Sequence, residues 1–149
     1  MLDNVRSALN VGSVFRTADA FRIEKIMLCG ITACPPNKDI LKTALGATAS
    51  VAWEHHENTK EAVVMLKSSG FRVYAVEQVS GSTPLEDFQP DGNRLAVVFG
   101  HEMDGVGQSV IDVCDGAIEI RQGGTKHSLN IAVCAGIICW ELHRKLSHL

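Results

Sequence analysis

The chain has 149 residues, of which 46% are hydrophobic and 21% charged, so it suits one domain with a buried core and falls outside the disordered and fibrous classes. No run approaches the roughly 18 apolar residues of a membrane span, and the N-terminus lacks the layout of a secretory signal. The formal net charge of −3 argues against a generic nucleic-acid binder, which usually has a strong basic excess.

The charge is unevenly distributed along the chain. Residues 1–50 hold six basic and four acidic side chains, residues 54–115 hold four basic and eleven acidic, and residues 116–149 hold four basic and two acidic. Both ends are therefore locally basic, which can steer an anionic partner even on an acidic protein. Ordinary scatter explains segment sums of this size equally well.

Apolar periodicity predicts alternating helices and strands. In chain order the first half predicts a helix around 11–21, a strand at 25–29, a loop at 34–37, a helix at 39–45 and a helix opened by a capping box at 58–61. The second half predicts strands at 71–77, 94–99 and 117–120, then a long helix capped by Ser128 that runs to about Leu146. This alternation predicts one α/β domain, three layers deep, with a mainly parallel sheet.

The five cysteines are odd in number and lie mostly in apolar runs, which predicts reduced thiols in a cytoplasmic protein. Their spacing is unlike that of zinc sites, and the adjacent His55 and His56 would face opposite sides of a strand. We therefore predict no metal site. Trp53 and Trp140 are expected in core or interface packing.

Three polar clusters exceed what packing requires. The first, NVGSVFRTAD at 10–19, brings Asn10, Gly12 and Arg16 to a helix start, where backbone N–H groups can meet an anion. A helix cap at Asn10 and a solvated Arg16 are the plain structural alternative. On a helix Arg16 lies one turn after Gly12, so both could border one pocket.

The second cluster, FGHEMDGVG at 99–107, places three glycines directly after a buried strand. Such a loop lets backbone approach a ligand at the carboxyl edge of a parallel sheet. It has neither the dinucleotide fingerprint nor the P-loop spacing. A plain strand-to-helix turn, with Glu102 as a capping acid, is equally compatible with the pattern.

The third cluster lies at 118–130, where a strand leads through Gly123 and Gly124 to a helix start. A capping role explains Ser128 but leaves the other polar and basic residues of this loop unexplained, namely Arg121, Lys126, His127 and Asn130. Their convergence predicts a site.

In this order the clusters resemble the signature motifs of the SpoU (TrmH-type) RNA 2′-O-ribose methyltransferases of the SPOUT superfamily. NVGSVFRTAD resembles the first motif, FGHEMDGVG the second and IRQGGTKHSLNIAVCAGI the third, and KTALGATASVAW resembles the connecting segment. The resemblance implies a C-terminal trefoil knot, a homodimer, S-adenosylmethionine as methyl donor and the ribose 2′-hydroxyl of tRNA or rRNA as acceptor.

The resemblance also implies roles for individual residues. The catalytic set that it implies is Arg16, Asn10, Glu102, Ser128 and Asn130. The cofactor-binding set that it implies is Glu77, Phe99, Gly100, Glu102, Gly105, Ile120, Gln122, Ser128 and Leu129. A guanidinium normally stays protonated, so Arg16 is expected to hold a phosphate and stabilise developing alkoxide charge rather than act as the base.

The chain departs from the family pattern in two places. Arg121-Gln122 stands where members usually have Pro-Met, so the shape of the cofactor loop or its RNA contacts is expected to differ. The chain also starts where the family's first strand ends, so we expect residues 1–149 to be a single catalytic domain that is short at the N-terminus.

Methylation of tRNA, at guanosine, is the favoured function, because the segment RVYAVEQ at 72–78 resembles tRNA guanosine methyltransferases of this family. Methylation of rRNA, a catalytically silent RNA- or nucleotide-binding module, and an ordinary nucleotide-binding oxidoreductase remain as alternatives. RNA and a second copy of the chain are the expected partners, with no membrane and no metal.

Overall fold

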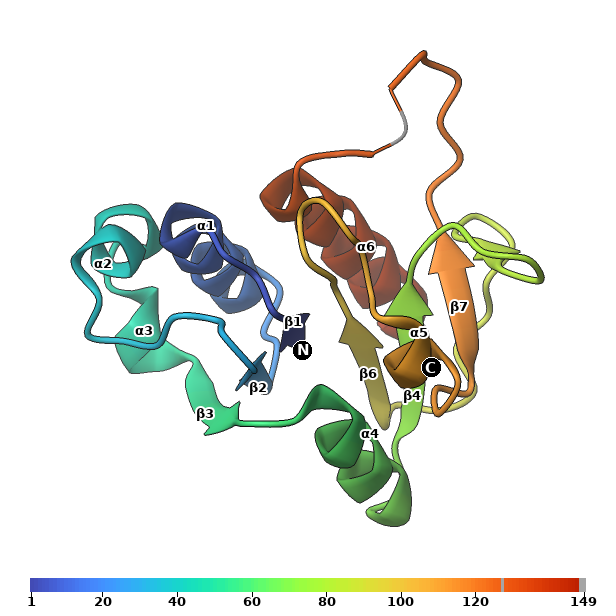
Figure 1. The fold of residues 1–149 in the computed structure, drawn as a ribbon, viewed down its shortest axis with the longest axis horizontal. Coiled ribbons are helices and arrows are strands. Elements are labelled where there is room, and N and C mark those ends of the chain that lie inside the picture. The colour runs from blue at the N-terminus through green and yellow to red at the C-terminus, as the bar shows by residue number, and fades with distance from the viewer. Residues whose placement is uncertain (127, 148–149) are drawn as a thin grey trace.

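A computed structural model describes residues 1–126 and 128–147. The strands are β1 (Leu2–Asp3), β2 (Lys25–Cys29), β3 (Ala52–His56), β4 (Arg72–Val76), β5 (Thr83–Pro84), β6 (Leu95–Val98) and β7 (Gly116–Glu119). The helices are α1 (Ala8–Ala20), α2 (Lys38–Ala44), α3 (Ala47–Ser50), α4 (Thr59–Ser68), α5 (Gln108–Ile111) and α6 (Ile131–Leu146). Figure 1 shows their arrangement.

The strands pair in parallel in two groups, ordered β1-β2-β3 and β5-β7-β4-β6. The short strand β1 joins the groups, because Leu2 also forms a parallel bridge with Phe99, directly after β6. The amide of Asp3 donates to the Phe99 carbonyl over 2.8 Å, and the amide of Phe99 donates to the Met1 carbonyl over 2.9 Å. The α/β fold with parallel strands that the sequence predicts is therefore present.

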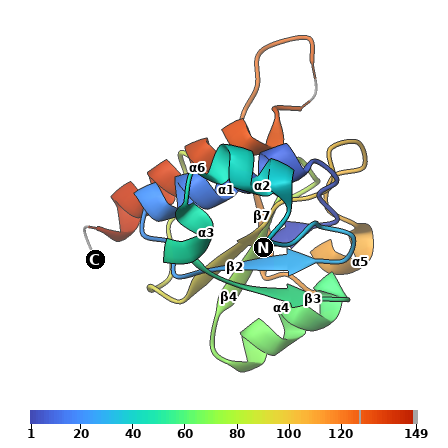
Figure 2. The same cartoon turned by 90° about the vertical axis from the view of Figure 1, so that its left-hand side faces the viewer.

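Helices pack on both faces of the strands (Figure 2). One buried cluster joins residues of α1, α2, α3 and α6 to the strands, with Phe15 and Ile138 fully buried in it. A second cluster contains residues of α4 and α5, among them Val63 and Val110, packed against Val73 and Val98. The strands therefore lie between two buried cores.

Local sequence signals explain several helix starts. The side chain of Asn37 accepts hydrogen bonds from Asp39 N and Ile40 N at the start of α2, and Asn58 accepts from Glu61 N at the start of α4. The strand predicted at 25–29 has the same bounds as β2. The predicted cap of the last helix is wrong, because Asn130 rather than Ser128 caps α6. Ser7 caps α1, so Asn10 lies inside that helix and the structural alternative of a cap at Asn10 does not hold.

The structure also contains short elements that the sequence did not predict, namely β1, α3, β3, β5 and α5. They have between two and five residues and lack the continuous apolar run that marks the predicted strand at 25–29; in β3, for example, no residue is buried. Of the core or interface packing expected for the two tryptophans, the core position is wrong for both, because Trp53 is 36% and Trp140 54% exposed. His127 lies outside the described residues.

A buried lysine anchors the end of α6. Lys145 Nζ donates to the carbonyls of Leu85, Glu86 and Phe88 over 2.8, 3.1 and 2.6 Å. It also lies 3.3 Å from Glu141 Oε1, whose carboxylate accepts two hydrogen bonds from Arg144. These bonds, with Lys145, lower the pKa of Glu141 to about 2. The end of α6 is thereby tied to the loop after β5.

None of the helices in residues 1–126 and 128–147 is long and apolar enough to cross a membrane.

A pair of neighbouring valines tests which face of α4 is buried. Val63 is fully buried and Val64 is 47% exposed. We expect Val63→Ala to lower the free energy of unfolding by about 2 kcal/mol, because it removes two buried methyl groups and leaves a cavity. Val64→Ala should change it by less than about 0.5 kcal/mol. Urea unfolding of both variants measures the difference, and equal losses would contradict this packing.

Candidate functional site

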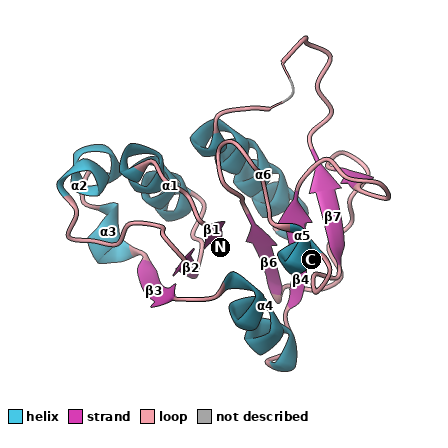
Figure 3. Ribbon diagram, viewed as in Figure 1, coloured by secondary structure: helices cyan, strands magenta, loops and turns pink. Residues whose placement is uncertain are grey.

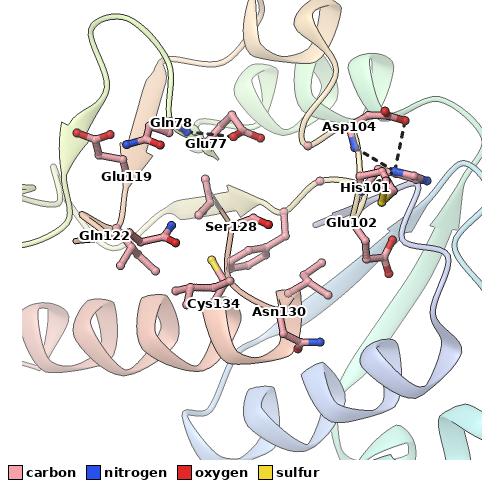
Figure 4. A pocket seen from close by; sticks show the side chains of 18 of the residues that line it. Glu77, Gln78, His101, Glu102, Asp104, Glu119, Gln122, Ser128, Asn130 and Cys134 are labelled. Carbon is pink, nitrogen blue, oxygen red and sulfur yellow. Dashed lines mark hydrogen bonds and ion pairs between the residues drawn. The ribbon is translucent and has the colours of Figure 1, made fainter. Parts of the chain in front are cut away.

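A pocket of ≈ 470 Å³ lies where the chain leaves β4, β6 and β7 and enters α6 (Figure 4). Its lining consists of Val76, Glu77, Gln78, Phe99, Gly100, His101, Glu102, Met103, Asp104, Gly105, Ile118, Glu119, Ile120, Gln122, Ser128, Leu129, Asn130, Ile131 and Cys134. These positions lie at the carboxyl ends of parallel strands, where open α/β sheets bind ligands. Figure 3 shows loop over residues 120–126 and 128–130, and Ile120, Gln122, Ser128, Leu129 and Asn130 of these stretches line the pocket.

Two of the three glycines of the 99–107 loop, Gly100 and Gly105, serve its internal packing. A Cβ on Gly100 would lie 2.1 Å from the backbone carbon of Gly105, and the amides and carbonyls of His101 and Gly105 bond to each other. Gly105 has φ +69, and a Cβ there would lie 2.1 Å from Glu77 Oε2. Both positions therefore require glycine because neighbouring parts of the chain come close to them. The sequence had indicated close approach to a ligand as the reason.

Glu77 stabilises this loop from the neighbouring strand end. Its Oε2 accepts a hydrogen bond from Val106 N over 3.0 Å, and its Oε1 accepts one from Gln78 N over 3.1 Å. The carboxylate thus lines the pocket and fixes the glycine loop at the same time.

Glu102 connects the second polar cluster to the first. Its carboxylate accepts hydrogen bonds from the amides of Arg6 and Ser7, each over 3.1 Å, and Ser7 is the cap of α1. Burial alone would raise the pKa of Glu102, but the hydrogen bonds from Ser7, Arg6 and the Asn10 side chain outweigh burial and lower it. Glu102 therefore positions the start of α1 beside the pocket.

Two asparagines connect the first cluster to the third. Asn130 Nδ2 donates to Asn10 Oδ1 over 3.3 Å. Asn130 Oδ1 accepts from the amides of Ala132 and Val133 at the start of α6. With Glu102, these side chains form a polar link through all three clusters.

Arg16 is the predicted site residue that lies apart from this pocket. It is exposed on α1 and lines a second cavity, of ≈ 540 Å³, between α1 and α2. Asn10 does not line the first pocket either, but its hydrogen bond to Asn130 places it at the pocket's edge. The predicted residues Glu102, Ser128 and Asn130 and the whole predicted cofactor-binding set do line the first pocket.

Arg121, which was expected to change the shape of the cofactor loop or its RNA contacts, pairs with two acidic side chains of this domain. Its guanidinium pairs with Glu86 over 3.0 Å and lies 3.7 Å from Asp87. Both acids belong to the loop that Lys145 also anchors. The pairs are exposed, so their contribution to stability is small.

Several lining residues were not predicted from the sequence, namely Gln78, His101, Asp104, Glu119 and Cys134. The first four directly adjoin predicted site residues, so proximity in sequence could have indicated them. Cys134 gave no signal, because it lies one turn into α6 within an apolar run; burial raises the pKa of its thiol to about 11. Within the described part of the chain, no group of three His, Cys, Asp or Glu residues is placed to hold a metal ion.

Residues 1–140 match the family model described as the SpoU rRNA Methylase family. The chain belongs to this family. It is 30% identical over 145 residues to a TrmH-family tRNA/rRNA methyltransferase from Staphylococcus epidermidis, and the match covers 97% of this chain and 57% of that protein. It is 28% identical over 147 residues to a tRNA/rRNA methyltransferase of Borreliella burgdorferi, covering 99% of this chain and 64% of that protein.

Solved structures of the family have the same fold. A TrmH-family RNA methyltransferase structure from Porphyromonas gingivalis has a TM-score of 0.87 and 28% identity, covering 97% of this chain and 58% of that one. An rRNA methyltransferase from Sinorhizobium meliloti, solved with AdoMet bound, has a TM-score of 0.90 and 27% identity, and the match covers 97% of this chain and 55% of that one. The SpoU domain thus spans little more than half the length of most of these relatives.

Replacing Glu102 by Gln tests its positioning role, because an amide cannot accept both backbone hydrogen bonds equally well. The pKa of Glu102 is lowered in the folded state from an ordinary value of 4.5, so its stabilisation is fully present above that value and lost as pH falls through the folded value. We expect Glu102→Gln to lower the free energy of unfolding at neutral pH, with the difference from wild type shrinking as the solution is acidified.

Urea unfolding at a series of pH values measures this difference. Glu24→Gln is the matched control, because Glu24 is exposed and forms no ion pair among the residues that the structure describes. A loss for Glu102→Gln that is independent of pH would contradict the role of the charge.

Proposed function

We propose that this domain transfers a methyl group from S-adenosylmethionine to a ribose 2′-hydroxyl of RNA, with tRNA guanosine as the first candidate acceptor. One observation carries the proposal: residues of the second and third family motifs surround a single pocket, and the Asn130–Asn10 hydrogen bond attaches the first motif to it. Names of the relatives, which mention tRNA and rRNA, support RNA as the substrate class.

The charge of the pocket suits this cofactor. Its described lining includes the carboxylates of Glu77, Glu102, Asp104 and Glu119 and no Lys or Arg side chain. S-adenosylmethionine carries a sulfonium and an ammonium group against one carboxylate, so an acidic pocket favours it. The pyrophosphate of a dinucleotide would be repelled there, which argues against the oxidoreductase alternative.

The walls of the pocket suit a nucleoside. Phe99, Ile120 and Leu129 supply apolar surface for the adenosine, while Gln122 and Ser128 supply polar groups at the opposite ends of the 122–128 loop. The cofactor supplies an electrophilic methyl group on a good leaving group, so the chemistry calls for no metal. The domain then has to align the ribose oxygen with that methyl group and exclude water.

We assign Arg16 to the acceptor side of the reaction. Its guanidinium can hold the phosphate next to the target ribose in a bidentate manner and stabilise charge on the 2′-oxygen. Asn10, Ser128 and Asn130 would orient the ribose and the arginine. Because Arg16 lines a different cavity from the cofactor pocket of its own subunit, we propose that it completes the pocket of a partner subunit in a homodimer.

An apolar stripe on α6 supports the homodimer. Val133, Ile137 and Trp140 recur at helical spacing and are 53%, 38% and 54% exposed. Leu9, on the neighbouring helix α1, is 43% exposed. A second copy of the chain would cover this surface, and such a contact would bring its α1 toward the first subunit.

Two further properties of the family are proposed for this chain. The first is the C-terminal trefoil knot, for which membership of the SpoU family gives support. The second is a cytoplasmic location, for which the five free thiols give support.

Mass-spectrometric mapping of 2′-O-methylated nucleosides in total tRNA and rRNA, with and without the gene, tests the function. Loss of one methylated tRNA nucleoside is the expected result. Loss of an rRNA nucleoside would support the rRNA alternative. If no nucleoside changed and the purified domain transferred no methyl group to unmodified RNA, the domain would be a silent binding module instead.

Substitution of Arg16 separates its role from cofactor binding. We expect Arg16→Ala to lower the methylation rate by roughly 100-fold to 1,000-fold, as for loss of a group that stabilises transition-state charge. S-adenosylmethionine affinity, measured by calorimetry, should stay close to that of wild type. Arg16→Lys keeps the positive charge but lacks the paired N–H donors of the guanidinium, so a large residual methylation rate would contradict bidentate binding of the phosphate.

Subunit mixing tests whether Arg16 acts across the dimer. Leu129 lines the pocket and is 37% exposed, so Leu129→Trp should block the pocket without disturbing the core. The inactive Arg16→Ala and Leu129→Trp subunits are unfolded and refolded together. If Arg16 acts across the dimer, each mixed dimer holds one intact site out of two. Because half of the dimers are mixed, the sample regains about a quarter of wild-type activity. No recovery, with mixed dimers detected by native mass spectrometry, would place Arg16 in its own subunit's site.

A further inference from the structure

The cavity between α1 and α2 is basic. Arg16 and Lys42 are the charged side chains in its lining, which contains no Asp or Glu. The rest of the lining combines hydroxyl groups of Ser13, Thr17 and Thr43 with the apolar side chains of Ala20, Phe21 and Leu45. Its charge is therefore opposite to that of the cofactor pocket.

Both cations are exposed and uncommitted within the described part of the chain. Neither Arg16 nor Lys42 forms an ion pair or a side-chain hydrogen bond there. In contrast, Lys67, Arg72 and Arg144 each pair with a carboxylate. Asp19, on the same helix as Arg16, accepts a hydrogen bond from Ser50 Oγ over 2.6 Å instead.

The two helices that carry these cations are held at a fixed separation. A Cβ on Gly12 would lie 2.1 Å from Thr43 Oγ1 and 2.3 Å from the carbonyl oxygen of Ile40, so only glycine lets α1 approach α2 this closely. Thr43 Oγ1 also donates to the Leu9 carbonyl over 2.8 Å. Gly12 thus allows α2 to pack closely on α1. It does not line the cavity beside Arg16, although the sequence suggested that the two residues border one pocket.

We propose that this cavity binds a backbone phosphate of the RNA substrate, with Lys42 as a second phosphate ligand beside Arg16. The guanidinium supplies a planar pair of donors and the ammonium a mobile point charge, which together suit one phosphate group. Leu45, which is 66% exposed, offers apolar surface to the adjoining ribose or base. This inference rests on the proposed function, because it takes the anion to be RNA.

The test is the salt dependence of RNA binding by Lys42→Ala, with Lys38→Ala as the matched control. Lys38 lies one turn earlier on the same helix, has the same charge and does not line the cavity. The probe is an unmodified transcribed tRNA, and binding is measured by fluorescence anisotropy over a range of salt concentrations. Because both lysines are on a helix surface, thermal unfolding of each variant serves as the check on folding.

We expect Lys42→Ala to weaken tRNA binding by roughly threefold to tenfold and to lower the slope of log affinity against log salt by about 0.7–0.9, the loss of one phosphate contact. Lys38→Ala should leave the slope unchanged, and Lys42→Arg should restore most of the affinity. S-adenosylmethionine affinity should be the same in all variants.

Equal effects of Lys42→Ala and Lys38→Ala would overturn the inference, and so would a wild-type domain that binds no tRNA at low salt. The proposed function is read separately, from methyl transfer by the wild-type domain. If the domain methylates RNA but Lys42→Ala and Lys38→Ala have equal effects, the proposed function holds and the proposed phosphate site is wrong. If the domain binds tRNA through Lys42 but methylates no RNA, the phosphate site holds and the proposed function is wrong.

Discussion

The two-residue strand β1 is the contact on which the arrangement of the site depends. It pairs with β2 on one side and with the chain at Phe99 on the other, so it joins the two groups of strands. Phe99 begins the glycine loop, and β1 leads directly to α1, so this one pairing brings two distant motifs together. The Glu102 carboxylate then fixes the start of α1 through the amides of Arg6 and Ser7.

The structure separates charge in a way that the net value of −3 conceals. Carboxylates gather around the pocket at the strand ends, and two cations that have no ion pair among the residues the structure describes line the cavity between α1 and α2. A cationic methyl donor and an anionic RNA would each meet surface of opposite sign. The composition therefore gave a misleading exclusion, because a small basic surface can bind an anion on an acidic protein.

Periodic patterns predicted the longer elements because their signals are local: the strand at 25–29 and the helix opened by Asn58 follow from adjacent residues. Positions set by distant contacts could not be predicted in this way. Asn130 rather than Ser128 caps α6, in a loop where either could act, and Gly12 faces another helix. The family motifs indicated the pocket residues, but they did not indicate that Arg16 lines a separate cavity between α1 and α2.

The hydrogen bond between Asn10 and Asn130 spans 120 residues of sequence. Contacts this distant form slowly, because the chain loses loop-closure entropy before they stabilise it. During synthesis the first motif leaves the ribosome long before its partner is made, so it waits in a partly folded chain. The pocket can therefore form only after the chain has been made as far as Cys134, and ligand binding there would report that all three motifs have come together.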